Sequence, residues 1–259
     1  MENCISSIRN WMVAHKLKLN ESKTEFIMLG TPLMLSKMNI NSISIGSNNI
    51  PPSSKVRNLG VIFDSNMKYE EHVKKICRTG NYYLYNLRKI RKHMSQDTMH
   101  KLVRAFIHSH IDYCNSVLYN IPDYLIKRLQ RILNNAAKLV RNSYDIPSQN
   151  ALCSLHWLPV NLRIEYKLLV LVFKALHNQC PTYLSQHIIP VHNTRYSMRS
   201  NNSLNLAIPR TKRKTLGDRS FHYSGPFLWN KLPPSIRSAS TLDSFTTKLK
   251  TYFFRLAFM

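Results

Sequence analysis

Residues 125–140 read LIKRLQRILNNAAKLV, and this stretch decides the fold class. Its apolar side chains recur at intervals of three and four residues, which places them on one face of a helix. Lysine and arginine occupy much of the rest, and Pro122 stands where proline favours the start of a helix. The pattern therefore predicts an amphipathic helix that packs against others. Its buried face should contain Leu125, Leu129, Ile132, Leu133, Ala136 and Val140.

Further helices are predicted on both sides of this one. Apolar residues at helical spacing indicate a helix within residues 68–92. Ser95 should cap a helix that runs to about residue 119, with Asp97 in its first turn. The remaining helices predicted in this way run from about Val160 to His177 and from Leu242 to Leu256, the latter capped by Thr241.

The first 65 residues have a different pattern. A helical repeat at the start is followed by short apolar runs that Gly, Pro, Asn and Ser interrupt. Such runs are typical of short strands, which we expect within residues 23–30, 43–45 and 56–64. Helix and strand are thus mixed in this part of the chain.

Residues 190–240 are rich in Ser, Asn, Pro, Arg and Lys and show weak periodicity, so we expect an irregular segment with one short strand near Leu204–Ile208. The sequence as a whole predicts an α+β fold. Small N-terminal strands should be followed by a mainly helical bundle and by an irregular basic C-terminal region. The three expected regions are residues 1–65, 66–145 and 146–259.

The charge of the chain restricts its partners. It has 37 Lys and Arg against 13 Asp and Glu, a formal net charge of +24. An acidic partner would relieve the resulting self-repulsion, and nucleic acid also releases counterions on binding. Aromatic residues lie among the cations, as at Tyr82, Tyr83 and Tyr85. The alternative is a basic protein whose charges are simply solvated.

The five cysteines, at positions 4, 77, 114, 153 and 180, are odd in number and widely spaced. With no signal peptide recognised, this usage favours a reducing intracellular compartment, nuclear or cytoplasmic, over secretion. No apolar run is as long as a membrane span, so a membrane partner is not expected.

Two pairs of side chains have the inner spacing of zinc ligands. They are Cys153 with His156 and His177 with Cys180. The alternative is that each pair lies in an ordinary apolar turn or helix end. The cluster His108, His110 and Cys114 is a weaker candidate, since the two histidines diverge on a helix. We therefore predict no metal site, and no nucleophilic catalytic group is marked.

Several strings of this sequence resemble a known family of enzymes. Residues 17–25, LKLNESKTE, and residues 58–61, NLGV, resemble two consecutive motifs at the end of a reverse transcriptase palm. Later strings resemble the thumb and C-terminal extension of non-LTR retrotransposon polymerases of the jockey and CR1 type. These are IDYCNSVL at 111–118, LQRILNNAAK at 129–138, HWLPV at 156–160 with Arg163 and Ile164, and FLWNKLP at 227–233.

The resemblance covers residues 5–256 and implies a function. The parent enzyme is an RNA-directed DNA polymerase, and this portion of it holds the template–primer duplex. The first 65 residues would be the remnant of the palm, followed by a thumb-like bundle. Lys23 would lie near the incoming triphosphate, and Leu59 and Gly60 would form the hairpin called the primer grip.

Other nucleic-acid contacts are expected from charge. Arg128, Arg131 and Lys138 lie on the helix of residues 125–140. The densest basic run is Arg210, Lys212, Arg213 and Lys214, which would bind phosphates or direct nuclear import. A solvated basic loop is the alternative for this run. Contacts of this kind position RNA, DNA or a hybrid without reading its sequence.

The chain departs from the family at the catalytic motif. Family polymerases hold two Mg²⁺ ions with clustered aspartates, and this sequence has no adjacent pair of aspartates. Its acidic doublet Glu70-Glu71 suits a helix start instead, and Asp64 has no second carboxylate beside it. We therefore expect no cofactor in this chain and no polymerisation by it alone.

The expected partners are nucleic acid and the N-terminal part of the polymerase, which an upstream reading frame would encode. The first hypothesis is a transposon-derived fragment with passive nucleic-acid affinity. The alternative is a host-retained basic binding or scaffold protein with no polymerase role, and an unfolded relic is a third outcome. Residues 1–65 should be the least stable part, because a truncated palm leaves strand edges unpaired.

Overall fold

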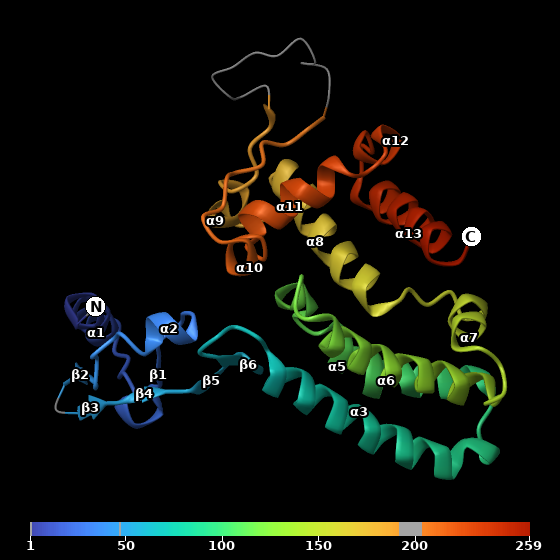
Figure 1. The fold of residues 1–259 in the computed structure, drawn as a ribbon, viewed down its shortest axis with the longest axis horizontal. Coiled ribbons are helices and arrows are strands. Elements are labelled where there is room, and N and C mark those ends of the chain that lie inside the picture. Colours follow the sequence, from blue (N-terminus) through green and yellow to red (C-terminus); the bar gives the residue numbers. More distant parts are fainter. Residues whose placement is uncertain (1, 47, 192–203) are drawn as a thin grey trace. The chain divides into compact units, whose positions relative to one another are not determined.

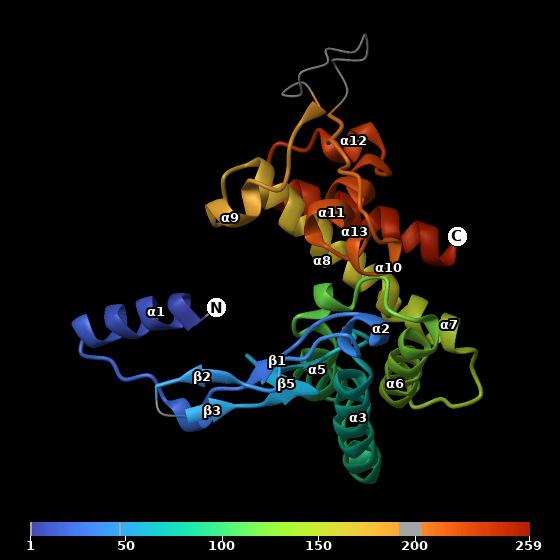
Figure 2. The ribbon, with the colours of Figure 1, turned by 60° about the vertical axis from the view of Figure 1, so that its left-hand side comes forward.

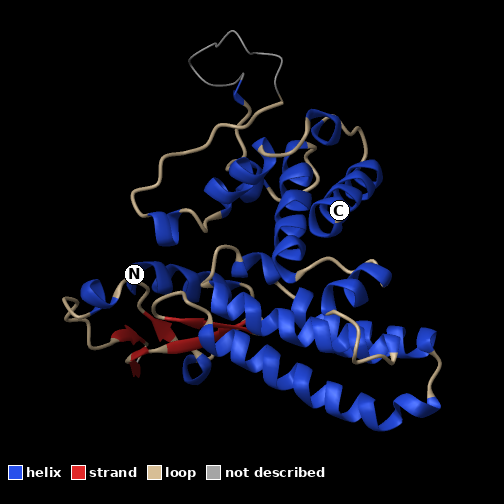
Figure 3. Cartoon of the chain, turned by 45° about the vertical axis from the view of Figure 1, so that its right-hand side comes forward, coloured by secondary structure: helices blue, strands red, loops and turns tan. Residues whose placement is uncertain are grey.

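The computed structural model describes residues 2–46, 48–191 and 204–259, without the side chains of Glu2, Glu21 and Lys214. Its contacts divide the chain into two compact units, residues 1–72 and 73–259. Figure 3 shows strands in the first unit and helices throughout the second. The predicted α+β, mostly helical fold class is confirmed.

The first unit combines two helices with short strands that pair two by two within its described residues. A parallel pair joins Phe26 to Pro52, and the other two pairs are antiparallel. The predicted N-terminal helix is confirmed. The elements are α1 (Glu2–Ala14), β1 (Phe26–Ile27), α2 (Pro32–Leu35), β2 (Ile43–Ile45), β3 (Asn48–Ile50), β4 (Pro52–Ser53), β5 (Lys55–Asn58) and β6 (Val61–Asp64), labelled in Figure 1.

The single strand predicted for residues 56–64 is instead the hairpin of β5 and β6. Asn58 lies opposite Val61, so Leu59 and Gly60 form a two-residue turn. Both have positive φ, 44° and 87°. Turns with two positive φ angles match the right-handed twist of the flanking strands, and Gly60 adopts this conformation without strain.

The N-terminal half of the second unit is built on two long helices, α3 (Glu70–Ile90) and α6 (Asp123–Arg141). A Cβ atom added at Gly80 of α3 would lie only 2.7 Å from Cγ2 of Ile132 in α6, so the helices approach closely there. Arg91, just after α3, donates to the carbonyl oxygens of Leu139 and Val140 at 2.8 and 3.1 Å. These carbonyls belong to the last turn of α6, where a cation is favourable.

The helix predicted from Ser95 to residue 119 begins as expected, because the Ser95 hydroxyl accepts a hydrogen bond from Thr98 N. It ends earlier, at Asp112, since Cys114 has a left-handed φ of 51° and a separate 3-10 turn follows. It is also not uniformly α-helical. The helix consists of α4 (Gln96–Val103), a π-helical segment (Arg104–His108) and α5 (Ser109–Asp112).

The C-terminal half of the second unit surrounds α8 (Val160–Leu176), which confirms the helix predicted there. Buried residues lie on several sides of α8 because it packs against α6, α11 (Phe221–Asn230) and α13 (Leu242–Phe258). Figure 2 shows α8, α11 and α13 together. Thr241 accepts a hydrogen bond from Ser244 N and caps α13 as predicted, and Leu256 near its end is exposed.

The prediction of an irregular segment over residues 190–240 is wrong in its second half. There α10 (Lys214–Gly217), α11 and α12 (Pro234–Arg237) form, and Trp229 at the end of α11 is buried. The strand predicted near Leu204–Ile208 is only an isolated bridge between Leu206 and Pro190. Trp229 and Asn230 hold this segment by hydrogen bonds to the Leu204 and Leu206 carbonyls, each of 2.8 Å. The short helices are α7 (Ser148–Ser154), α9 (Thr182–Ser185), α10 (Lys214–Gly217) and α12 (Pro234–Arg237).

Candidate nucleic-acid interface

The hairpin tip expected to contact the primer is prominent in the first unit. The Leu59 side chain is 83% exposed at the turn between β5 and β6. Lys23 is exposed at the end of a 3-10 turn that precedes β1. Glu25, two residues on, accepts a hydrogen bond from Arg57 N of β5 at 3.5 Å. The structure thus links the Lys23 segment to the hairpin.

The three cations predicted on α6 lie along one flank of the helix but differ in environment. Arg131 is exposed, whereas Arg128 is half-buried and lies near Cys77 of α3. Burial raises the pKa of the Cys77 thiol, and the Arg128 charge partly offsets this. Lys138 donates to the Tyr144 carbonyl at 3.1 Å and so stabilises the end of α6. Arg131 is therefore the most accessible of the three.

The basic run predicted near residue 212 lies before and at the start of α10. Arg210, Lys212 and Arg213 are exposed, while the side chain of Lys214 lies outside the described part of the chain. The neighbouring Thr211 hydroxyl donates to Asp218 at 2.6 Å, which closes this segment against the end of α10. Arg210, Lys212 and Arg213 thus lie together in one exposed segment. No described contact joins them to the cations of α6.

A face of α3 carries a stronger combination of charge and aromatic surface. Tyr82 and Tyr85 are 63% and 59% exposed. The Lys89 ammonium lies 4.2 Å from the centre of the Tyr85 ring. Tyr83, in contrast, is half-buried and stacks on Phe106 with ring centres 5.0 Å apart. The exposed residues that share this face by helical spacing are Lys74, Arg78, Tyr82, Tyr85 and Lys89.

A second basic feature is a pocket of about 600 Å³ that the sequence analysis did not predict. His100, Arg104, His108 and Asp112 line it from one helix at intervals of four residues. In an α-helix such positions drift by about 40° at each step. The wider π-helical turn between Arg104 and His108 reverses part of this drift, and π-helical turns occur often at functional sites. The regular four-residue spacing of polar groups was the signal in the sequence.

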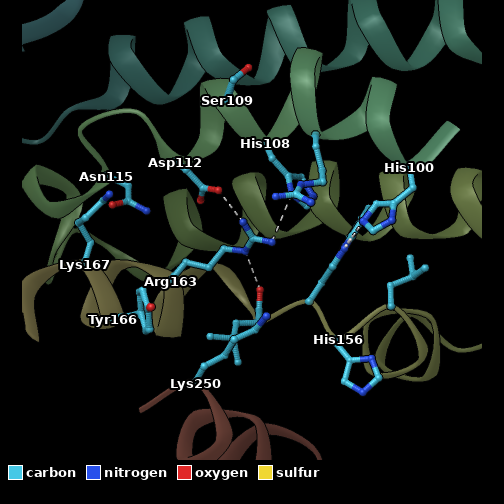
Figure 4. A pocket seen from close by; sticks show the side chains of 14 residues that line it. His100, His108, Ser109, Asp112, Asn115, His156, Arg163, Tyr166, Lys167 and Lys250 are labelled. Atoms are coloured by element: carbon cyan, nitrogen blue, oxygen red, sulfur yellow. Dashed lines mark hydrogen bonds and ion pairs between the residues drawn. The ribbon is translucent and has the colours of Figure 1, made fainter. Parts of the chain in front are cut away.

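Arg163 of α8 organises the floor of this pocket (Figure 4). It donates to the Leu158 carbonyl at 2.9 Å and to Asp112 at 2.6 Å, and its third nitrogen lies 3.4 Å from Nδ1 of His108. Because arginine only donates, Nδ1 of His108 accepts and Nε2 carries the proton. That Nε2 is buried without a hydrogen-bond partner within the described part.

The two histidines that this helix contributes to the pocket, His100 and His108, both have a lowered pKa. Burial is the main cause that lowers the pKa of His108 to about 2, and the charges of Arg163, His100 and Arg104 contribute to the same shift. Burial and Arg104 also lower the pKa of His100. Trp157 donates from Nε1 to Nε2 of His100 at 3.2 Å, which requires that nitrogen to be unprotonated. Arg104 contributes to the lowered pKa of both histidines, so a cation lies close to each of them.

The candidate zinc ligands do not form a metal site. Among the described residues there is no group of three or more His, Cys, Asp and Glu side chains placed to hold a metal ion. His156 stacks on Phe254, and His177 stacks on Phe173 while its Nδ1 lies 2.8 Å from the Phe173 carbonyl oxygen. These histidines thus have packing roles.

None of the helices in the described part of the chain combines the length and the apolar character that crossing a membrane requires. No protein-family model, curated protein or solved structure matches the chain.

Proposed function

We propose that this chain is the C-terminal part of a non-LTR retrotransposon reverse transcriptase and that it binds template–primer nucleic acid without polymerising by itself. The sequence strings described above support the family. The observation that carries the binding function is the exposed face of α3, where tyrosines and cations share one side of a long helix. We call Lys74, Arg78, Tyr82, Tyr85 and Lys89 the α3 face.

The two kinds of side chain on the α3 face have separate roles in this proposal. Lysine and arginine neutralise phosphates and fix the position of the strand. Exposed tyrosines stack on unpaired bases whatever their identity, and each such contact contributes about 1–3 kcal/mol. The α3 face therefore suits the single-stranded template beside a primer end. The Leu59–Gly60 tip would add a backbone contact, because a turn with a glycine allows a close approach.

Asp64 and the doublet Glu70-Glu71 act as structural groups rather than as magnesium ligands. The Asp64 carboxylate accepts hydrogen bonds from Lys68 N and Tyr69 N at 2.9 and 2.5 Å, just before α3. Glu70 and Glu71 lie in the first turn of α3, where negative charge is favourable. The metal-binding aspartates would accordingly lie in a separate portion of the polymerase.

The binding claim is tested with a labelled primer annealed to a template that has a single-stranded overhang. If about six phosphates are contacted, log K should fall against log salt with a slope near −5. Replacing Arg78 and Lys89 by Gln should reduce that slope by about one each. Lys101→Gln, which removes an exposed cation from α4, is the charge-matched control. A salt-independent affinity would refute binding through phosphates.

Stacking is tested separately. Tyr82→Ala and Tyr85→Ala should each weaken overhang binding by about 1–3 kcal/mol, with little effect on a blunt duplex. Tyr183→Ala is the matched control, since Tyr183 is a 67% exposed tyrosine on α9. Equal losses in all three variants would contradict a specific role for the α3 face. Primer extension by the purified chain with Mg²⁺ and nucleotides would contradict the absence of polymerisation.

A further inference from the structure

The pocket that contains Arg163 is also lined by three cations that are exposed to solvent. Arg104, Lys167 and Lys250 line it from the π-helical segment, α8 and α13, and all three are exposed. None of them takes part in an ion pair within the described part of the chain, whereas Arg163 is paired with Asp112. Four cations less one carboxylate give the described lining a formal charge of about +3, with histidine counted as neutral as in the net charge of the chain.

The floor of the pocket adds a donor that lacks a partner. His108 is only 7% exposed, and its Nε2–H has no acceptor in the described structure. A buried donor without an acceptor is destabilising, so an acceptor that enters the pocket would be favoured. The three cations are exposed to solvent, whereas the neutral His108 donor is buried. An anion with several acceptor oxygens fits this arrangement.

We propose that this pocket binds a phosphate monoester, with the 5′-phosphate of a nucleic-acid strand as its source. A monoester carries a charge of about −1.5 to −2 at neutral pH and three acceptor oxygens, whereas a phosphodiester carries about −1. The excess of positive charge in the pocket therefore favours a strand end over a position inside a strand. The strand as source rests on the proposed function, but monoester binding itself rests only on the pocket.

The test compares two oligonucleotides that differ only in a 5′-phosphate or a 5′-hydroxyl, each labelled at the 3′ end. At fixed salt the phosphorylated strand should bind about tenfold more tightly, because charge-assisted hydrogen bonds to it are added. Arg104→Gln and Lys250→Gln should each remove most of this preference. Lys248→Gln is the control, since it removes a charge from α13 two residues away, where Lys248 donates to the Ser235 carbonyl.

Free nucleoside monophosphate and inorganic phosphate separate the two proposals. Monoester binding that Arg104→Gln and Lys250→Gln abolish, without any oligonucleotide binding, would support the pocket and contradict the proposed function. Oligonucleotide binding with no preference for a 5′-phosphate would overturn the pocket and leave the proposed function standing. A preference that survives in the Arg104→Gln, Lys250→Gln double variant would also overturn the pocket. Circular dichroism verifies that these surface variants fold.

Discussion

The second unit, residues 73–259, buries the apolar sides of long helices. The first unit, residues 1–72, consists largely of short paired strands and buries few side chains. In the second unit α6 and α8 each contribute eight buried residues. In the first unit α1 leaves Trp11 and Val13 58% and 65% exposed. The apolar side chains buried among the described residues of the first unit are Phe26, Ile45, Val61 and Tyr69.

The difference shows that strand pairing does not replace a core. Ordering a residue costs about 1–2 kcal/mol of backbone entropy, and full burial of a large apolar side chain contributes about 1.5–3 kcal/mol. The long helices of the second unit, α6 and α8 above all, bury such side chains along their length. The two-stranded pairs of the first unit do not, and isolated pairs of strands are marginal in water. Stability should therefore be concentrated in the second unit.

The largest expected effect is in amide hydrogen exchange. Amides of β5 and β6 should exchange at least about a hundredfold faster than those of α6 and α8, because local opening of the first unit needs little free energy. Exchange measured by mass spectrometry on peptides from both units tests this. Uniformly slow exchange across residues 1–72 would contradict it.

The second largest expected effect is a loss of stability of the second unit in acid. His108 stays neutral in the folded chain down to a pKa of about 2, against 6.5 when unfolded. Between these values the unfolded chain binds the extra proton, so the stability that neutral His108 contributes is complete above pH 6.5 and is lost as pH falls. From pH 7 to pH 5 the loss should be about 2 kcal/mol. Chemical denaturation of the wild type and His108→Asn at both pH values isolates this residue, and equal losses in the two proteins would count against it.

A smaller effect is expected where α3 meets α6. Gly80→Ala would place a Cβ 2.7 Å from Cγ2 of Ile132. The overpacking should outweigh the gain in helix propensity and reduce the free energy of unfolding by about 1–2 kcal/mol. Ile132→Ala removes the clashing methyl group, so the double variant should be more stable than the two single changes predict. Simple additivity in this double-mutant cycle would show that the helices separate freely.

The smallest expected effect concerns the turn of the first unit. Leu59 has a φ of 44°, which leucine rarely adopts and asparagine tolerates. Leu59→Asn should stabilise the hairpin by a few tenths to about 1 kcal/mol. Exchange of β5 and β6 amides should slow several-fold while that of α6 stays unchanged. A slowing in α6 as well would show that the two units are coupled.

Much of the helical fold follows from the sequence. The start of α6 after Pro122 and the caps Ser95 and Thr241 were predictable, because they depend on local chemistry. The helices over residues 214–237 were not, since α11 contains Gly225 and Pro226, which oppose helix. Gly225 is needed there for space, because a Cβ would lie 2.9 Å from Val172 of α8. Packing between distant segments overrides local propensity at such places.

The candidate site was predicted less well than the fold. Charge and aromatic content pointed to Tyr82 and Tyr85, but only the structure separates them from Tyr83, which is half-buried and stacked on Phe106. The Arg163 pocket depends on residues more than fifty positions apart in the sequence. It also depends on the π-helical turn, which no local pattern in the sequence indicated.

That turn makes the number of residues in this helix matter as much as their identity. Removing one residue between Arg104 and His108 would allow ordinary α-helical hydrogen bonds to close, and all that follows would rotate by about 100° and shift by about 1.5 Å. Arg163 would then meet neither His108 nor Asp112 in the present geometry. Related chains should thus vary the exposed side chains of this helix freely, while the distance in residues from His100 to Asp112 stays fixed.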